Sequence, residues 1–330
     1  MYELFCEMLR RGLEPDARAY DAVVSACEKR GPWRTPLELV DDLRKRGVRP
    51  GILLYNALIS ACAKSSGAQW KTTLELLAEG QRCGLEPDTV TYSATISACA
   101  KGGQWQKVLE LFDDLQQRDL KPDGMTYDAM ITACSKTGAR WEKAFELFDD
   151  MQQRGLEPDV TTHMALISAC KKGGQWERAV RVLKNMQRLG LKPDLTTYIV
   201  AIAACEKSGQ WRQAFELFVD LQRSGLKPNI ITYNTMISAC VKGGQWEKAF
   251  WLFDDLQRRR GLEPGIITYN AMLSACATGG QWERAFEVFA DLRKRGRKRR
   301  LEPNIMTYNA MISACERGGQ WEKAFELFDK

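Results

Sequence analysis

Hydrophobic residues recur along the chain at helical spacing, in two kinds of segment that alternate. In the first kind, such as residues 89–101, positions 4, 7, 8 and 11 share one face and are mostly Tyr, Met or Leu, Ile and Cys. In the second kind, Trp141, Ala144, Phe145 and Phe148 follow the i, i+3, i+4, i+7 pattern, with Glu, Lys and Asp between them. Each pattern predicts an amphipathic helix, and neither helix can bury its apolar stripe alone.

These segments belong to an internal repeat marked by three residue types. Nine of the eleven prolines precede Asp, Asn or Gly and lie 35 to 39 residues apart. A cysteine follows each of these prolines by 12 residues, and a tryptophan follows each cysteine by 6 to 8. We number each repeat from the second residue after proline, which gives eight full repeats: 17–51, 52–88, 89–123, 124–159, 160–194, 195–229, 230–265 and 266–304. A partial repeat occupies 1–16, and an incomplete ninth repeat occupies 305–330.

The variation in repeat length separates helices from loops. Extra residues occur only between the cysteine and the tryptophan, or just before the proline, as in residues 258–261 and 295–300. Insertions that avoid the periodic segments indicate loops. Each repeat is therefore predicted to be a helix–turn–helix unit, with the Asp, Asn or Gly after proline as N-cap of the first helix. Stacked units predict an all-α fold, a right-handed α-solenoid superhelix with about 35 residues per repeat. Because both ends fall inside a predicted second helix, we expect a fragment of a longer array.

Charge and cysteine content exclude several classes of protein. The net charge of +6 permits polyanion binding without requiring it. The sequence has no apolar run near the roughly 20 residues of a membrane span. The repeated cysteines lie on the packed face of helices about 10 Å apart, which is beyond the roughly 7 Å limit for a disulfide. Reduced, buried thiols are expected, and without a CxxC pair neither a zinc site nor any other metal site is predicted. The tryptophans lie on the apolar stripe, so core packing is favoured over base stacking.

The sequence offers no constellation for catalysis. The single histidine, His163, replaces the buried tyrosine of its repeat, and P-loop, GxSxG and zinc-deaminase motifs are all missing. The Asp-Asp pair that recurs in the second helix is predicted to lie on the surface. We expect a protein that is not an enzyme and needs no cofactor or small-molecule substrate.

A basic residue recurs at position 13 of the first helix. It shares a face with positions 2 and 5, which vary between repeats, and eight of its nine copies are basic: Lys29, Lys64, Lys101, Lys136, Lys172, Lys207, Lys242 and Arg317, with Thr278 as the exception. One cation per repeat beside a row of variable residues suits a phosphate backbone with readable bases. The alternative is a solvated groove rim copied by repeat duplication.

Together these features resemble the pentatricopeptide repeat over essentially the whole chain. The resemblance rests on the 35-residue period, on Thr-Tyr-Asn at positions 3 to 5 as in residues 231–234, and on the closing Gly-Leu-x-Pro-Asn/Asp of residues 225–229. The tetratricopeptide repeat is the nearest rival, and its first-helix signature is missing. The resemblance implies sequence-selective binding of single-stranded RNA on the concave face, about one nucleotide per repeat. It also implies organellar RNA processing, stabilisation or translation, in the chloroplast or mitochondrion, with other RNA-processing proteins as further partners.

The resemblance also assigns roles to positions. In the family, position 5 and the last residue of a repeat read a base, and position 2 wedges between bases. The implied base-reading residues are Asn56, Asp88, Ser93, Asp123, Asp128, Asp159, Asn234, Asn270 and Asn304, and the implied wedges are Val90, Met125, Ile231 and Ile267. Asn56 with Asp88 resembles a uracil reader, Ser93 with Asp123 a guanine reader, and Asn270 with Asn304 a pyrimidine reader. The pairs that begin with Asp21, Asp128, Met164, Ile199 and Asn234 fit the family's code poorly.

Two alternatives stay open from the sequence. A helical solenoid can also serve as a protein-interaction scaffold, with a peptide in the same groove. The basic run Arg293–Arg300, seven basic residues in eight, is predicted to be a solvated loop insertion, although it could also contact RNA phosphates or mimic a nuclear signal.

Overall fold

The computed structural model describes residues 51–64, 69–137, 140–259, 261–299, 301–320 and 322–324, and over these residues the chain is helical with no strand. The first helix of each repeat, here helix A, is α4 (Ile52–Lys64), α6 (Thr89–Lys101), α8 (Gly124–Thr137), α10 (Val160–Gly173), α12 (Leu195–Lys207), α14 (Ile230–Lys242), α16 (Ile266–Gly279) or α18 (Ile305–Arg317). The second, helix B, is α5 (Trp70–Arg82), α7 (Trp105–Gln117), α9 (Trp141–Gln153), α11 (Trp176–Arg188), α13 (Trp211–Arg223), α15 (Trp246–Arg258) or α17 (Trp282–Arg299). The predicted all-α repeat fold is confirmed.

Helix starts follow the sequence markers. Every helix A begins at the second residue after proline, and every helix B begins at the tryptophan. The start of α6 shows the cause: Asp88 accepts a hydrogen bond from the Thr91 amide at 2.9 Å, and the Thr91 hydroxyl accepts one from the Asp88 amide at 3.2 Å. This reciprocal capping satisfies two amides that the helix itself leaves unpaired. The same arrangement recurs at α14 and α18, with Asn as the cap.

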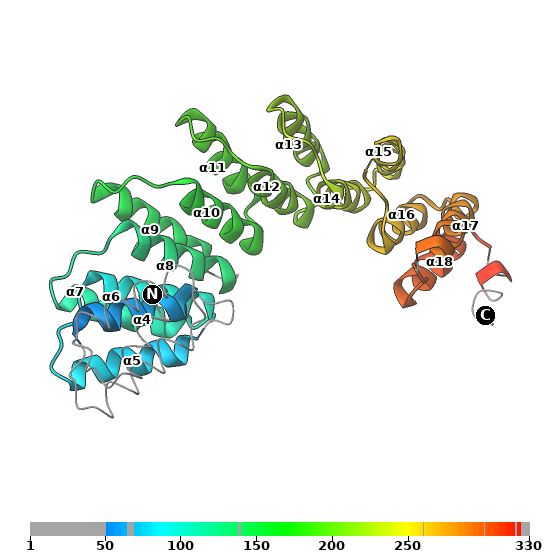
Figure 1. Ribbon diagram of the computed structural model, residues 1–330. Helices are drawn as coiled ribbons and strands as arrows, with labels where there is room; N and C mark the ends of the chain where they lie inside the picture. The colour runs from blue at the N-terminus through cyan, green and yellow to red at the C-terminus, as the bar shows by residue number, and fades with distance from the viewer. Residues whose placement is uncertain are drawn as a thin grey trace. The chain divides into compact units, whose positions relative to one another are not determined.

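The helices pack in two layers. The chain divides into two compact units, residues 1–169 and 170–330, with the boundary inside α10. Within the units, α6 contacts its own helix B (α7), the preceding helix B (α5) and the next helix A (α8), and α14 makes the corresponding contacts with α15, α13 and α16 (Figure 1). Within each unit, helices A therefore pack against one another in one layer, and helices B pack against that layer. In the part of the chain that the structure describes, no helix is long and apolar enough to cross a membrane.

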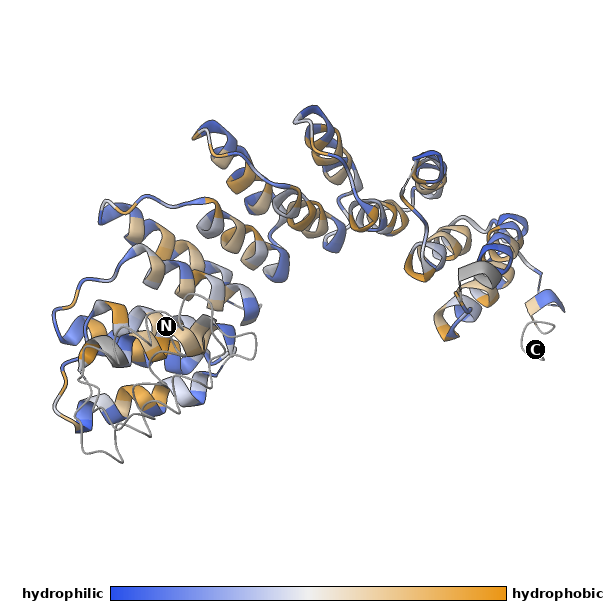
Figure 2. Ribbon diagram, viewed as in Figure 1, coloured by the Kyte–Doolittle hydropathy of each residue, from blue (hydrophilic) through white to orange (hydrophobic). Residues whose placement is uncertain are grey.

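The core lies between these layers, as the hydropathy colouring indicates (Figure 2). Its largest members are the helix-A tyrosines, represented by Tyr92 and Tyr233, which are fully buried. One cysteine per repeat lies beside them, and the described cysteines form no disulfide and are buried, apart from the exposed Cys83. Burial raises the pKa of the Cys99 thiol to about 11. These thiols are packing residues, as predicted from their place on the apolar stripe.

In the described Asp-Asp pairs, the second aspartate is not simply a surface residue, contrary to our prediction. Asp150 accepts hydrogen bonds from the buried Tyr127 hydroxyl and from Arg154 one turn later. Burial raises the pKa of Asp150, but the two donors outweigh it, and the net pKa lies below the ordinary value. The first aspartate, Asp149, is exposed as predicted. The buried hydroxyl of the helix-A tyrosine needs a hydrogen-bond partner, and the aspartate of helix B provides it.

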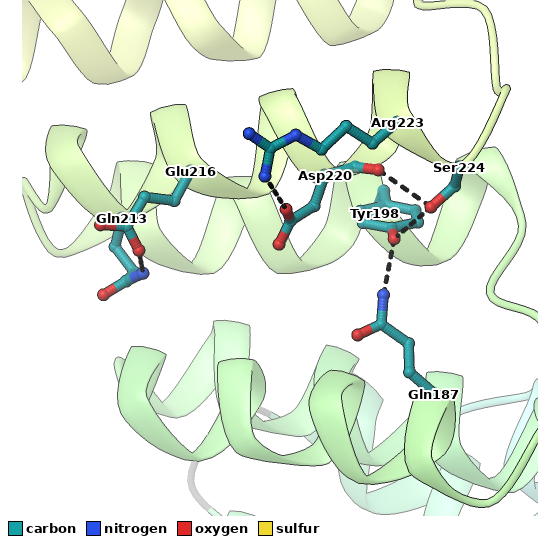
Figure 3. Close-up of polar contacts among 7 residues, drawn as sticks. All are labelled: Gln187, Tyr198, Gln213, Glu216, Asp220, Arg223 and Ser224. Carbon is teal, nitrogen blue, oxygen red and sulfur yellow. Dashed lines mark hydrogen bonds and ion pairs between the residues drawn. The ribbon is translucent and has the colours of Figure 1, made fainter.

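The repeat 195–229 shows what happens when the arginine is replaced (Figure 3). Ser224 stands one turn after Asp220, where other repeats have Arg, and Asp220 lies 3.9 Å from the guanidinium of Arg223. The Tyr198 hydroxyl instead accepts from Gln187 of the preceding helix B at 2.7 Å and lies 3.1 Å from the Ser224 hydroxyl. The buried hydroxyl stays paired through a different set of partners.

Tryptophan and glycine meet where consecutive repeats join. A Cβ atom added to Gly243, at the end of α14, would lie 2.3 Å from Cδ1 of Trp211 in the preceding repeat. On α15 the Lys248 ammonium lies 4.2 Å from the Trp211 ring centroid, within cation–π range. The same pairing recurs with Gly279 against Trp246 and Gly318 against Trp282. The tryptophans are thus packing residues of the repeat junctions, as predicted, and the glycine leaves the space that the ring fills.

The basic run at the end of α17 differs from the prediction. Helix α17 continues to Arg299, so that the inserted residues extend the helix instead of forming a loop. Arg and Lys have good helix propensity, and the single Gly296 costs only about 1 kcal/mol within a helix. Arg295 ties this segment to its own helix through Asp291, at 2.8 Å.

Candidate nucleic-acid interface

The predicted base-reading residues come together at the N-terminal ends of helices A. The Asn56 amide donates to both carboxylate oxygens of Asp88, at 3.2 and 3.0 Å. The Ser93 hydroxyl donates to Asp123 at 3.0 Å. The Asn270 amide donates to Asn304 at 3.2 Å. Position 5 of one repeat and the N-cap of the next repeat therefore form a hydrogen-bonded pair at each of these junctions.

Two of the position-5 side chains in these pairs are less exposed to solvent than residues on an open surface. Asn56 is 8% exposed and Ser93 is 1% exposed, because the cap of the following repeat covers them. Asn270 is partly exposed and Asn304 is exposed. The first repeats of the described chain thus hold their position-5 side chain more deeply than the last one.

A third residue, missed by our reading of the sequence, completes each pair. It is the threonine at position 3 of the following repeat, whose hydroxyl bonds back to position 5. Thr91 bonds to Asn56, and Thr307 donates to Asn270 at 2.7 Å. Thr126 lies 2.8 Å from the Ser93 hydroxyl. These threonines are at most 2% exposed. The signal was present in the sequence, because threonine occupies position 3 in every repeat from 89–123 onward.

The pair Asp128 and Asp159 brings two carboxylates to one junction. The Thr162 hydroxyl is bonded to Asp128 and lies 3.1 Å from Asp159. Burial raises the pKa of Asp128, and the negative charges of Asp159 and Asp123 add to that effect. Excess negative charge at this junction is unfavourable for a polyanion.

Two junctions inside a single unit lack a polar pair for different reasons. Asn234 faces Gly265, which has no side chain, and Asn234 bonds only to Thr268, at 2.7 Å. Ile199 has no polar atom, and the threonine that follows it, Thr232, bonds to its own cap Asn229 at 2.9 Å. Asn234 thus retains the geometry of a position-5 reader, and Ile199 does not.

The predicted wedge residues are apolar side chains that protrude into solvent. Val90, Met125, Ile231 and Ile267 are 47%, 62%, 57% and 68% exposed. Each stands on the first turn of its helix A, three residues before position 5. Exposed large apolar side chains at the same place in several repeats indicate contact with a ligand, because burial in the protein does not account for them.

The basic residues at position 13 have a structural partner. Lys101 donates to the carbonyl of Ala63 at 2.6 Å, Lys136 to that of Lys101 at 2.7 Å, and Lys207 to that of Lys172 at 2.6 Å. Arg317 lies 3.5 Å from the carbonyl of Ala277. Each cation thus caps the C-terminal end of the preceding helix A, where the helix dipole is negative. An ammonium has three N–H donors, so the exposed Lys101 and Lys207 keep donors for a phosphate.

The row of cations is uneven. Lys242 lies 2.6 Å from Glu206, which also accepts from Ser238 at 2.8 Å, so that its charge is neutralised. Thr278 bonds only to its own helix backbone. Lys172 is exposed like its neighbours. Lys29 and the side chain of Lys64 lie outside the described residues, and so do the first repeat and Asp21.

His163 has the environment of a core residue. It is fully buried, its Nδ1 lies 2.8 Å from the Asp159 carbonyl oxygen, and its ring packs edge-on against Phe148. Among the described residues, no cluster of His, Cys, Asp or Glu could hold a metal ion.

Comparison with known protein families gives three matching models along the chain. The PPR repeat family matches residues 87–136, 125–172 and 228–278. The pentatricopeptide repeat domain matches 3–65 and 181–243, and the PPR repeat matches 161–191, 267–297 and 306–330. A comparison with curated proteins gives no match.

Among solved structures, the chain is similar to the pentatricopeptide repeat protein PPR10 in complex with an 18-nt psaJ RNA element. The identity is 20% and the TM-score 0.70, over 99% of this chain and 52% of that one. For PPR10 from maize the identity is 24% and the TM-score 0.53, over 97% and 49%. For nuclear proteinaceous RNase P 2 from Arabidopsis thaliana they are 16% and 0.51, over 57% and 42%. The chain spans about half the length of PPR10, and these likenesses establish the fold. With three models of one repeat matching along most of its length, the chain belongs to the pentatricopeptide repeat family.

Proposed function

We propose that this protein binds single-stranded RNA along its layer of helices A, with about one nucleotide per repeat. The observation that carries the proposal is the paired polar side chains at the N-terminal ends of these helices, between the exposed apolar residue of position 2 and the cation of position 13. Apolar side chains can stack against bases, polar pairs can read base edges, and lysines can contact phosphates. PPR10, whose fold this chain shares, was solved in complex with RNA.

The chemistry of the pairs sets the expected selectivity. Asp88 and Asp123 are acceptors, which suits the ring N–H of uracil or guanine, and Asn56 and Ser93 beside them supply the neighbouring polar contact. Asn304 accepts from Thr307 and Asn270 through its oxygen, which leaves its amide hydrogens for an acceptor such as the cytosine ring nitrogen. Binding of this kind would support RNA stabilisation, processing or translation in a chloroplast or mitochondrion.

Charge reversal of the cations tests the proposal. Changing Lys101, Lys136 and Lys172 to Glu removes three positive charges from the helix-A face and adds three negative ones. We expect at least a 100-fold loss of affinity for a random single-stranded RNA pool, measured by fluorescence anisotropy at several salt concentrations. For wild type, the logarithm of the binding constant should fall with the logarithm of the salt concentration, with a slope of about −0.7 per phosphate contact.

Two control proteins make the result specific. Lys107, Lys143 and Lys184 are exposed lysines on helices B, and their change to Glu alters net charge equally without touching the helix-A face. Changing the three helix-A lysines to Arg keeps the cations and should keep binding. If folded wild-type protein binds no single-stranded RNA, or if both Glu triples lose affinity equally, the proposal is wrong, and the protein scaffold becomes the better hypothesis.

A further inference from the structure

The contact between Thr268 and Asn234 determines which polar atoms of the asparagine side chain remain available to a ligand. The Thr268 hydroxyl accepts a hydrogen bond from the Gly265 amide at 3.2 Å and lies 2.7 Å from Asn234 Oδ1. Thr268 is fully buried, and its own cap residue is a glycine with no side chain to receive the hydroxyl proton. The proton therefore goes to the Asn234 oxygen, because a buried hydroxyl needs an acceptor.

This bond fixes the rotation of the carboxamide about its last bond. With its oxygen held by Thr268, Asn234 directs its NH₂ group away from the junction, on the helix-A face where position 5 lies. A rotation by 180° would leave the threonine proton without an acceptor and would bury it unpaired, at a cost comparable to a lost hydrogen bond. The asparagine is then a donor on this face, and its acceptor atom is used within the protein.

A threonine hydroxyl also bonds to a position-5 oxygen at three other junctions within the described units. Thr91 bonds to Asn56, Thr162 to Asp128 and Thr307 to Asn270, and each threonine belongs to the repeat that follows. The base-reading side chain of one repeat is thus held by a residue of the next. Cap residues differ among these junctions, but the threonine is constant and buried at each of them.

We propose that the threonine at position 3 is a specificity-positioning residue for the preceding repeat where that repeat has asparagine at position 5, as Thr268 is for Asn234. By donating to the Asn234 oxygen, Thr268 holds the amide so that its NH₂ group, which has no cap side chain to pair with at Gly265, meets the nucleotide, and this repeat then favours a base whose edge offers an acceptor. The inference rests on the proposed RNA binding and extends it: the selectivity of a repeat depends on the repeat that follows it.

Thr232 provides a matched control within the chain. Like Thr268 it accepts a hydrogen bond from its cap amide, that of Asn229 at 3.3 Å, and it also bonds to Asn229 Oδ1 at 2.9 Å, so that its cap contribution is at least as large. Ile199, the position-5 residue of the preceding repeat, has no polar side-chain atom that Thr232 could bond to. Changing Thr232 to Val therefore removes the cap contribution alone, whereas the same change at Thr268 removes the cap contribution and the hold on Asn234.

The test compares Thr268→Val, Thr268→Ser and Thr232→Val in the full chain. The best RNA from a selection with wild type is changed to each of the four bases at every position in turn, and the affinity ratios give the discrimination at each position. Thr268→Val should reduce discrimination about 3- to 10-fold at one position only, as expected for loss of one hydrogen bond. Thr268→Ser should keep it, and Thr232→Val should leave every position unchanged.

A double-mutant cycle distinguishes the loss of this hydrogen bond from a general effect on folding. Asn234→Ala should lower discrimination at the same position, and Thr268→Val should add nothing in that background, with helix content checked by circular dichroism. The inference is overturned if no position depends on Thr268, or if Thr232→Val has the same effect. Absence of RNA binding by wild type would instead overturn the proposed function, so the two failures are distinguishable.

Discussion

Replacing Gly243 with Ala should destabilise one repeat junction through a defined steric overlap. The added Cβ would lie 2.3 Å from Trp211 Cδ1 and 2.7 Å from Cγ. Ordinary carbon–carbon contacts begin near 3.5 Å, so the ring must move by about 1 Å. The Gly243 backbone has φ −82° and ψ 5°, which any L-residue can adopt, so the overlap is the only source of strain.

The size of the effect follows from the packing around the ring. Overpacking a well-filled site costs about 1–3 kcal/mol. Ser208 occupies the equivalent place in the preceding repeat, so the fold already accommodates a Cβ at one such junction. We therefore expect the lower part of the range, about 1–2 kcal/mol, which corresponds to about 5- to 30-fold faster opening of α13 and α14.

Hydrogen exchange measured by mass spectrometry is the suitable assay, because a repeat array opens locally and need not unfold in one step. Exchange in α13 and α14 should accelerate in Gly243→Ala, and exchange in helices α4 and α6 should not. Gly124→Ala is the control, since its Cβ would lie 3.9 Å from the nearest atom, on Met151. In a Trp211→Ala background the penalty of Gly243→Ala should disappear. If the penalty is unchanged there, or if Gly243→Ala is neutral in the wild-type background, the steric reasoning is wrong.

Three further changes have expected outcomes. Burial raises the pKa of Asp128, so the charged carboxylate destabilises the folded state. Asp128→Asn should therefore raise the melting temperature, by an amount that is near zero below about pH 4 and grows as the pH rises to the raised pKa. A gain that is the same at all pH values would contradict this. Asp119 has φ 55°, where its homologous positions have glycine, so Asp119→Gly should raise the free energy of unfolding by up to about 1 kcal/mol in urea titrations, and a loss would refute the strain. Glu206→Gln should release Lys242 and raise RNA affinity, with a salt dependence steeper by about 0.7, and an unchanged slope would show that Lys242 makes no phosphate contact.

The sequence allowed the repeat fold to be predicted closely because local signals agree with the packing. Proline, the cap residue and tryptophan determine where helices begin, and periodicity determines which face is buried. The sequence led to two wrong predictions: one where the hydrogen-bond partner lies in another helix, and one where an insertion was expected to be a loop. The pattern predicts Asp150 on the surface, but its partner Tyr127 lies 23 residues earlier. The inserted basic run after Arg293 is predicted to be a loop, but its composition also suits a helix, which the structure shows.

The candidate site was predicted in outline but not in its connections. The pairing of Asn56 with Asp88 followed from family resemblance, and the contact with Thr91 did not, because it joins residues of successive repeats 35 positions apart. Likewise, the lysines of position 13 were identified by their period, but their bonds to carbonyls depend on how one helix A lies against the next. Periodicity identifies which residues share a face, whereas contacts between repeats require the stacking geometry.

The bonds from position 13 to the preceding repeat have a consequence for how such a gene can change. Lys101, Lys136 and Lys207 each donate to a backbone carbonyl, and every residue type presents the same carbonyl. This link between neighbours therefore places no demand on the side chain it reaches. A duplicated or transplanted repeat could keep it at once, whatever its position 5 carries. Reading residues can then diverge freely by recombination, while the attachment between modules is inherited intact.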